Sequence, residues 1–247
     1  MKKKPIDLAY VLTLPPEKAV AYFRRKGRRV SFDWHSMWKE AHATAFTVAN
    51  CAKLDVLRDL QLGIRTMLKE GKSEQWFVRT LEPVLRAKGW WGPRDEVNPR
   101  TGEIIKVQQG SKWRLGLIAR QNVQSADNAG AWEEQWDNRE EEPYLRYVSM
   151  EDARTRPQHR ALHGKIFPVD DPFWQTHYPP NGWNCRCNVE GVSPARLKRR
   201  KWKVESSEGK MTTREIVIRD RRTGEETVRT VTGYRYDKDN VFWTDAG

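Results

Sequence analysis

The sequence predicts an α+β protein, with a mainly helical N-terminal domain followed by a smaller mixed α/β domain that includes a C-terminal β-hairpin. Through most of the first 140 residues, apolar side chains recur at steps of three and four, as on helices with one buried face. Later, short alternating segments lie between stretches rich in proline, glycine and aspartate. We therefore expect a basic arm (1–14), a helical domain (15–140), a motif-rich domain (141–195) and a basic run with the hairpin (196–247).

Helix start and stop signals divide the first domain. Pro16 can open a first helix, because proline fits the first helical turn, and Gly27 ends it. Ser31 or Asp33 can cap a long helical stretch whose apolar pattern continues through Ala45 and Ala52 to Leu68 and stops at a glycine. The remaining elements expected here are a helix capped by Ser73 and kinked at Pro83, a short strand over Glu103–Gln108, and a helix from Trp113 to Trp136.

The second domain is expected to consist of short strands and one helical turn. Pro157 can start that turn, and Gly164 ends it. The turn sequence Arg222-Thr223-Gly224-Glu225 lies between two alternating segments, which predicts a hairpin. The expected strands are Tyr144–Met150, Lys165–Val169, Cys185–Val189, Glu215–Arg219 and Thr227–Thr232.

The chain is strongly basic, with a net charge of +12 and a pI of about 9.7. Residues 1–30 contain nine lysines and arginines against two acids, and Arg196–Lys203 contains six in eight residues. Such patches suit phosphate backbones or acidic protein surfaces, although a solvated face or tail has the same composition. Glu133–Glu142 is an opposite, acidic patch that would suit contact between copies or with partners. The candidate DNA- or partner-binding residues are Arg24, Arg25, Lys26, Arg28, Arg29, Arg196, Lys198, Arg199, Arg200, Lys201 and Lys203.

Targeting and membrane signals are weak. The apolar stretch Leu8–Leu14 after Lys2–Lys4 is short and leads into two prolines, unlike a secretory leader. No run approaches the ~20 apolar residues that a membrane span requires. Three cysteines do not form a disulfide framework, so we expect a cytoplasmic product with no membrane span.

The densest motifs lie between Asp152 and Val192. In order they are Arg-Pro-x-x-His ending at His159, a glycine, an Asp-Pro-Phe-Trp turn, a Pro-Pro-x-x-Trp loop and Cys-Arg-Cys. This order resembles the C-terminal signature of the phage Mu F-like head morphogenesis family. The resemblance extends over 15–195 and includes Phe46-Thr47-Val48-Ala49, Gly89-Trp90-Trp91-Gly92 and, in a segment that lacks the family's usual tyrosine, Arg120 and Asn122. We interpret these motif residues as structural: Asp152, Arg154, Arg156, Pro157, Gly164, Asp170, Trp174, Pro180, Trp183 and Arg186.

The resemblance implies a role in assembly and no reaction. Members of the family are low-copy proteins inside the phage head or at its vertex, so the implied location is the virion. The implied partners are the portal protein, the major capsid or scaffold protein, and double-stranded DNA. No motif for reading a base sequence is visible, so DNA contact is expected to be non-specific and to the backbone.

Four side chains in the motif region could hold a zinc ion. His159 and His163 are four apart and would share one face of a helical turn, while Cys185 and Cys187 would share one face of a strand. Two nitrogens and two thiolates form a suitable tetrahedral set, but Cys-x-Cys is closer than the usual Cys-x2–4-Cys, and regular-strand geometry would hold the sulfurs too far apart. His177 is a further candidate ligand.

Two alternatives stay open for this cluster. The cysteines can be small apolar packing residues or a reduced pair, with His159 hydrogen-bonding the loop and no metal bound. The other alternative for the whole chain is a metal-dependent nuclease or toxin-like enzyme that uses the His/Cys/Asp cluster.

Overall fold

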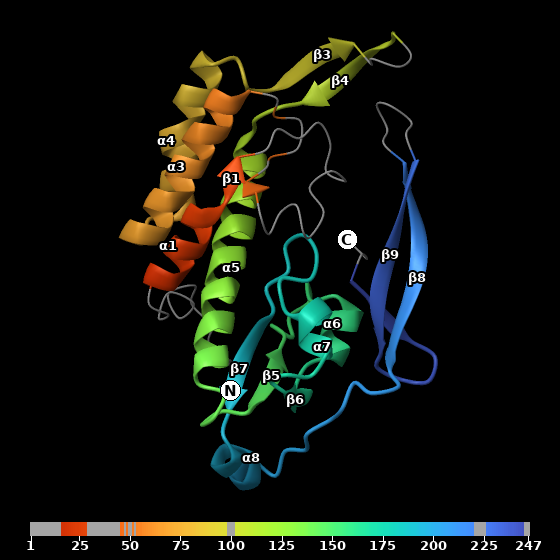
Figure 1. Cartoon of the computed structure of the whole chain (residues 1–247). Coiled ribbons are helices and arrows are strands. Elements are labelled where there is room, and N and C mark those ends of the chain that lie inside the picture. The colour runs from red at the N-terminus through yellow and green to blue at the C-terminus, as the bar shows by residue number, and fades with distance from the viewer. Residues whose placement is uncertain are drawn as a thin grey trace. The chain divides into compact units, whose positions relative to one another are not determined.

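The computed structural model describes residues 16–28, 45–46, 48, 51, 53–97, 102–219 and 226–244. The expected basic arm, Arg29, Ser31 and Asp33 lie outside these residues. The predicted α+β class is confirmed, since helices alternate with small, mostly antiparallel sheets (Figure 1). The chain forms two compact units: Met1–Asp127 with Val217–Thr227 is the first, and Asn128–Ile216 with Val228–Gly247 is the second. The domain bounds expected from the sequence stay a prediction.

Helices dominate the first unit. Its elements are α1 (Pro16–Arg25), β1 (Gly27–Arg28), β2 (Ala45–Phe46), α3 (Leu54–Glu70), α4 (Glu74–Ala87), β3 (Pro93–Val97), β4 (Ile104–Gln108) and the first part of α5 (Lys112–Asp137). In Figure 1, α3 lies between α1 and α4 and contacts both. Their apolar faces enclose a core that includes Phe23, Leu60, Ile64 and Phe77.

The ends of α3 and α4 follow from capping chemistry. Gly71 adopts the left-handed conformation with φ 62° after α3, a region that glycine enters without the Cβ penalty. Ser73 caps α4 as predicted, because its hydroxyl accepts a hydrogen bond from the Trp76 backbone N–H at 3.2 Å.

The prediction of one long helix from Ser31 or Asp33 through Ala45 is wrong at β2. Ala45–Phe46 is a short strand that pairs in parallel with β1, and α3 begins only at Leu54. The Phe46 ring is fully buried and meets Phe23 edge-on, with 5.7 Å between ring centres. Burial of aromatic surface outweighs the helical spacing of this apolar segment.

The second unit is built on a small antiparallel sheet with β5 at its centre. Its elements are the second part of α5, β5 (Tyr144–Val148), α6 (Pro157–Ala161), β6 (Ile166–Pro168), α7 (Phe173–His177), β7 (Asn188–Val192), α8 (Pro194–Arg200), β9 (Glu226–Arg235) and β10 (Val241–Trp243), with β8 (Met211–Arg219) beside β9. Strands β6 and β7 flank β5, with Leu145 opposite Phe167 on one side and Gly191 on the other. The predicted hairpin is confirmed as β8–β9, and β10 adds a third strand beyond β9.

One strand boundary differs from the expectation in a way that matters for the site. The third strand was expected over Cys185–Val189, but β7 begins at Asn188. Both cysteines therefore lie in an irregular segment before the strand, and the alternation of a regular strand does not fix the distance between their sulfurs.

Aromatic side chains fill the core of the second unit. Phe173 of α7 stacks on Phe167 at 4.4 Å and on His177 at 4.9 Å, and it meets Tyr234 of β9 edge-on at 4.9 Å. Phe242 of β10 joins the same buried cluster.

No described helix combines the length and apolar character needed to cross a lipid bilayer.

Gly63 provides a test of the α3–α4 contact. A Cβ placed there would lie 2.8 Å from the Phe77 ring and 3.0 Å from Leu81. We expect Gly63→Val to lower the free energy of unfolding by roughly 1–3 kcal/mol through overpacking. Urea-dependent hydrogen exchange of α3 and α4 peptides measures this. Leu62→Val is the matched control, because Leu62 is 57% exposed on the same helix. Equal effects of the two variants would contradict the close packing.

Candidate functional site

His159 enters the interior of the second unit from α6. Pro157 occupies the start of this helix, which places His159 within its single turn. The side chain is 2% exposed, and its ring lies 5.0 Å from that of Phe242. A polar ring in such surroundings needs hydrogen-bonding or metal partners.

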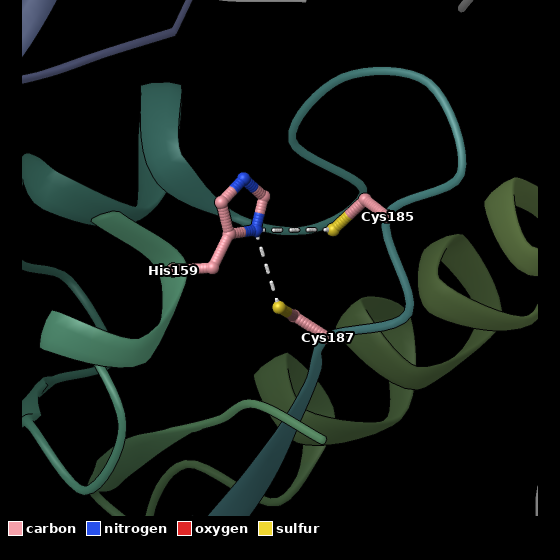
Figure 2. Close-up of side chains that lie close together, drawn as sticks. All are labelled: His159, Cys185 and Cys187. Atoms are coloured by element: carbon pink, nitrogen blue, oxygen red, sulfur yellow. Dashed lines mark hydrogen bonds between the residues drawn. The ribbon is translucent and has the colours of Figure 1, made fainter. Parts of the chain in front are cut away.

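Both cysteines of the Cys-Arg-Cys motif approach this ring. Figure 2 shows the two sulfurs directed toward the same nitrogen, with His159 Nδ1 at 3.3 Å from Cys187 Sγ and 3.7 Å from Cys185 Sγ. The three candidate ligand atoms all lie within 4.8 Å of one another, and all three residues are buried. Of the four ligands expected from the sequence, the structure brings together these three.

The two thiols influence each other strongly. Hydrogen bonds from the Cys187 thiol and then from His159 hold the pKa of Cys185 well below its ordinary value. The pKa of Cys187 is raised, first because its thiol donates to Cys185 and then because burial penalises a second negative charge. The raised pKa of Cys187 therefore opposes a second negative charge on this buried pair.

Tyr147 and Asn181 extend the cluster. The Tyr147 hydroxyl, on β5, hydrogen-bonds to the Cys187 sulfur, and burial raises its pKa well above the ordinary value. The Asn181 amide nitrogen donates to this hydroxyl at 3.3 Å and to the His177 carbonyl at 2.7 Å. The cluster is thus anchored to the sheet and to α7.

Arg156 supports the segment that carries the cysteines. Its guanidinium donates to the carbonyls of Asn181 at 3.3 Å and Trp183 at 2.6 Å, and it lies 3.4 Å from His159 Nε2. The segment has no strand ladder of its own, so these side-chain donors satisfy its backbone.

His163 and His177 belong to other contacts. The expectation for His163 is revised, because α6 ends at Ala161 and the helical four-residue spacing no longer applies at 163. Its Nδ1 lies 3.2 Å from the Ser149 backbone nitrogen, and its Nε2 lies 3.4 Å from a Glu151 carboxylate oxygen. His177 Nε2 lies 3.1 Å from the Phe242 carbonyl oxygen.

Asp152 and Arg186 form an ion pair with two hydrogen bonds in the motif region. The Arg186 guanidinium makes two hydrogen bonds of 2.7 Å to the carboxylate, and this pairing holds the pKa of Asp152 well below its usual range. Thr155 and the Arg154 backbone N–H donate to the same carboxylate. Arg154 itself contributes little, since its exposed side chain lies 3.9 Å from Asp152.

The other motif residues shape loops. Gly164 has φ 82°, which favours glycine, and its N–H donates to the Tyr147 carbonyl at 2.9 Å. The Trp174 indole donates to the Pro168 carbonyl at 3.0 Å. Pro180 follows Pro179 through a cis peptide bond.

Asp171 is a buried carboxylate, whereas its neighbour Asp170 is exposed. It accepts hydrogen bonds from the backbone N–H groups of Phe173 at 2.9 Å and Ser207 at 3.1 Å, and from the Ser207 hydroxyl. The spacing Asp171-x-Phe173 at a helix start could have indicated this role.

The basic residues separate into exposed and enclosed groups. Lys26 is 5% exposed, its ammonium lies 4.9 Å from the centre of the Tyr22 ring, and burial lowers its pKa to about 8. Its side chain is therefore enclosed in the fold and not available to a partner. Arg196 pairs with Glu190 at 2.8 Å and lies over the Trp202 ring. The structure describes no side chain for Arg28. The exposed residues of the set are Arg24, Arg25, Lys198, Arg199, Arg200, Lys201 and Lys203.

A comparison of the sequence with known protein families agrees with this combination of motifs. The family model "Phage Mu protein F like protein" matches residues 58–190, which is more than half of the chain. The chain belongs to the phage Mu F-like family. The match includes His159, both clustered cysteines and the Asp152–Arg186 pair.

Two relatives cover most of the chain. "Putative capsid assembly protein F" of Escherichia phage Mu is 42% identical over 226 residues, which are 91% of this chain and 51% of the relative. "Mu-like prophage FluMu F protein" of Haemophilus influenzae is 41% identical over 210 residues, which are 85% of this chain and 50% of the relative. The chain therefore spans about half the length of these relatives. An uncharacterized protein of Methanocaldococcus jannaschii is 33% identical over 49% of this chain and 17% of its own length. No solved structure matches significantly.

Asp171 and Asp170 offer a matched test of the motif region. Asp171→Asn replaces one of the two acceptor oxygens with an NH2 donor, so at least one of the donors that meet it, the N–H groups of Phe173 and Ser207 and the Ser207 hydroxyl, loses its acceptor. We expect a loss of roughly 1.5–3 kcal/mol in the free energy of unfolding, the range for hydrogen bonds to a charged group. Asp170→Asn should change it little, because Asp170 is exposed. Urea-dependent hydrogen exchange of α7 peptides measures both, and an equal response of the two variants would contradict the assignment.

Proposed function

We propose that this chain acts in phage head morphogenesis, in procapsid assembly and in packaging or delivery of DNA. The observation that carries the proposal is its 42% identity, over 91% of the chain, to a relative named for capsid assembly. The proposed partners are the portal protein, the major capsid or scaffold protein, and double-stranded DNA. The proposed location is the virion, in the head interior or at a vertex.

The exposed charges of α8 support a contact with DNA. Arg199, Arg200 and Lys201 lie at the end of this short helix, and none of them forms an ion pair with a carboxylate among the described residues. Positive charges near a helix C-terminus are favourable for the fold and can also meet phosphates. Contact of this kind reads no base sequence, so the proposed DNA binding is non-specific.

Neutralising part of this patch tests the DNA contact. We expect Arg199→Gln with Arg200→Gln to weaken binding to a random-sequence duplex and to reduce the slope of log affinity against log salt by roughly 1–2, because each lost phosphate contact removes ~0.9. Fluorescence anisotropy at several salt concentrations measures the slope. Arg58→Gln with Arg94→Gln is the control, since both residues are exposed on the first unit. The same loss in both variants would contradict a specific role for α8.

The portal contact is tested by affinity purification of tagged portal protein from cells in which the phage assembles. We expect this chain to co-purify with the portal and to be missing from heads assembled without a portal. Tagged major capsid protein serves as the comparison. Normal incorporation into heads that lack a portal would overturn the portal contact and leave a capsid or scaffold contact in its place.

The proposed role is structural and not enzymatic. The protein should therefore leave plasmid DNA intact in the presence of Mg²⁺ or Zn²⁺, as measured by gel electrophoresis. Metal-dependent cleavage that disappears in His159→Ala would replace the structural role with a nuclease.

A further inference from the structure

The spacing of three buried atoms matches the edges of a metal coordination sphere. His159 Nδ1 lies 3.3 and 3.7 Å from the two sulfurs of Cys187 and Cys185. A tetrahedral zinc ion with Zn–S near 2.3 Å and Zn–N near 2.0–2.1 Å requires N···S edges of about 3.6 Å and an S···S edge of about 3.8 Å. All three pairs lie within 4.8 Å, so an ion fits with small side-chain adjustments.

We propose that His159, Cys185 and Cys187 bind one zinc ion in the second unit, with a water molecule as the fourth ligand. The proposal is independent of the function in head assembly. Two thiolates neutralise the dipositive ion, and the sulfur and imidazole ligands favour zinc over the oxygen-preferring Mg²⁺ and Ca²⁺. His163 is not part of this set, because its ring contacts Ser149 and Glu151.

The irregular backbone removes the main objection to Cys-x-Cys ligation. On a regular strand, the spacing of same-face side chains would hold the two sulfurs too far apart. Here β7 begins only at Asn188, and the preceding segment bends so that both sulfurs approach one nitrogen (Figure 2). The distance is set by the turn that Arg156 and Arg186 hold in place.

Groups around the ligands support an ion. The Tyr147 hydroxyl hydrogen-bonds to the Cys187 sulfur, and Asn181 in turn donates to Tyr147. Such outer hydrogen bonds orient metal ligands and tune their charge. The Asn181 side-chain oxygen is buried and has no hydrogen-bond partner among the described residues, so it is an acceptor that a zinc-bound water can use.

Zinc would take the place of protons at this cluster. His159 Nδ1 lies 3.3 Å from the Cys187 sulfur, and the Arg156 guanidinium lies 3.4 Å from Nε2. Binding of an ion by Nδ1 and both sulfurs would require that none of these three atoms carries a proton, so zinc would displace the thiol protons. Arg156 also donates a shorter hydrogen bond, of 2.6 Å, to the Trp183 carbonyl.

The ion would connect α6 to the segment before β7. His159 and Cys185 are 26 residues apart in the chain, and the two segments also meet where the Arg156 guanidinium donates to the Asn181 and Trp183 carbonyls. Metal binding to the folded state alone stabilises that state by mass action. Removal of zinc should therefore lower the thermal stability of the second unit.

The test is zinc content of the full chain, purified under reducing conditions and exchanged into metal-free buffer. Inductively coupled plasma mass spectrometry should find about one zinc ion per chain. Cys185→Ser and Cys187→Ser should lose it. The matched controls Cys51→Ala, at a buried cysteine of the first unit, and His163→Ala should retain it. Far-UV circular dichroism shows whether each variant is folded.

Cobalt substitution keeps the test valid if the cysteine variants fail to fold. The wild-type chain reconstituted with Co²⁺ should show a thiolate-to-cobalt charge-transfer band and the intense visible bands of a tetrahedral site. Absence of zinc together with absence of these bands would overturn the proposal. In that case a mass lower by two hydrogens would identify a Cys185–Cys187 disulfide, and an unchanged mass a free thiol pair.

Discussion

The segment between α7 and β7 has no helix or strand ladder to satisfy its backbone, and this constraint organises the motif region of the second unit. Arg156 reaches two of its carbonyls, and Arg186 within the segment pairs with Asp152. With the segment held on both sides of Cys185, its two cysteines meet His159. The family motif is therefore one connected set of hydrogen bonds rather than a row of separate signals.

Local chemistry made much of the fold predictable. The Ser73 cap, the glycine after α3 and the C-terminal hairpin each depend on residues within a few positions of one another. The strand at Ala45–Phe46 was not predictable in the same way, because its apolar spacing also suits a helix. It is set by pairing with β1 and by burial of Phe46 against Phe23, which depend on distant parts of the chain.

The candidate site likewise depends on local sequence spacing in part and on distant contacts in part. Sequence spacing indicated His159 and both cysteines, but it also included His163, which lies beyond the end of α6 and turns to Ser149. Charge counting likewise placed Lys26 and Arg196 with the exposed basic residues, although Lys26 is buried and Arg196 pairs with Glu190. A count of charges does not distinguish a partner within the fold from a partner outside it.

The second unit needs more of the chain than the family match includes. That match ends at residue 190, yet Tyr234 packs against Phe173, and Phe242 packs against both His159 and His177. Without β9 and β10 these rings would lose buried apolar contacts, each a substantial part of the stability of a small core. The C-terminal strands thus complete the hydrophobic surroundings of His159. The chemistry of the motif therefore depends also on residues that lie outside the motif.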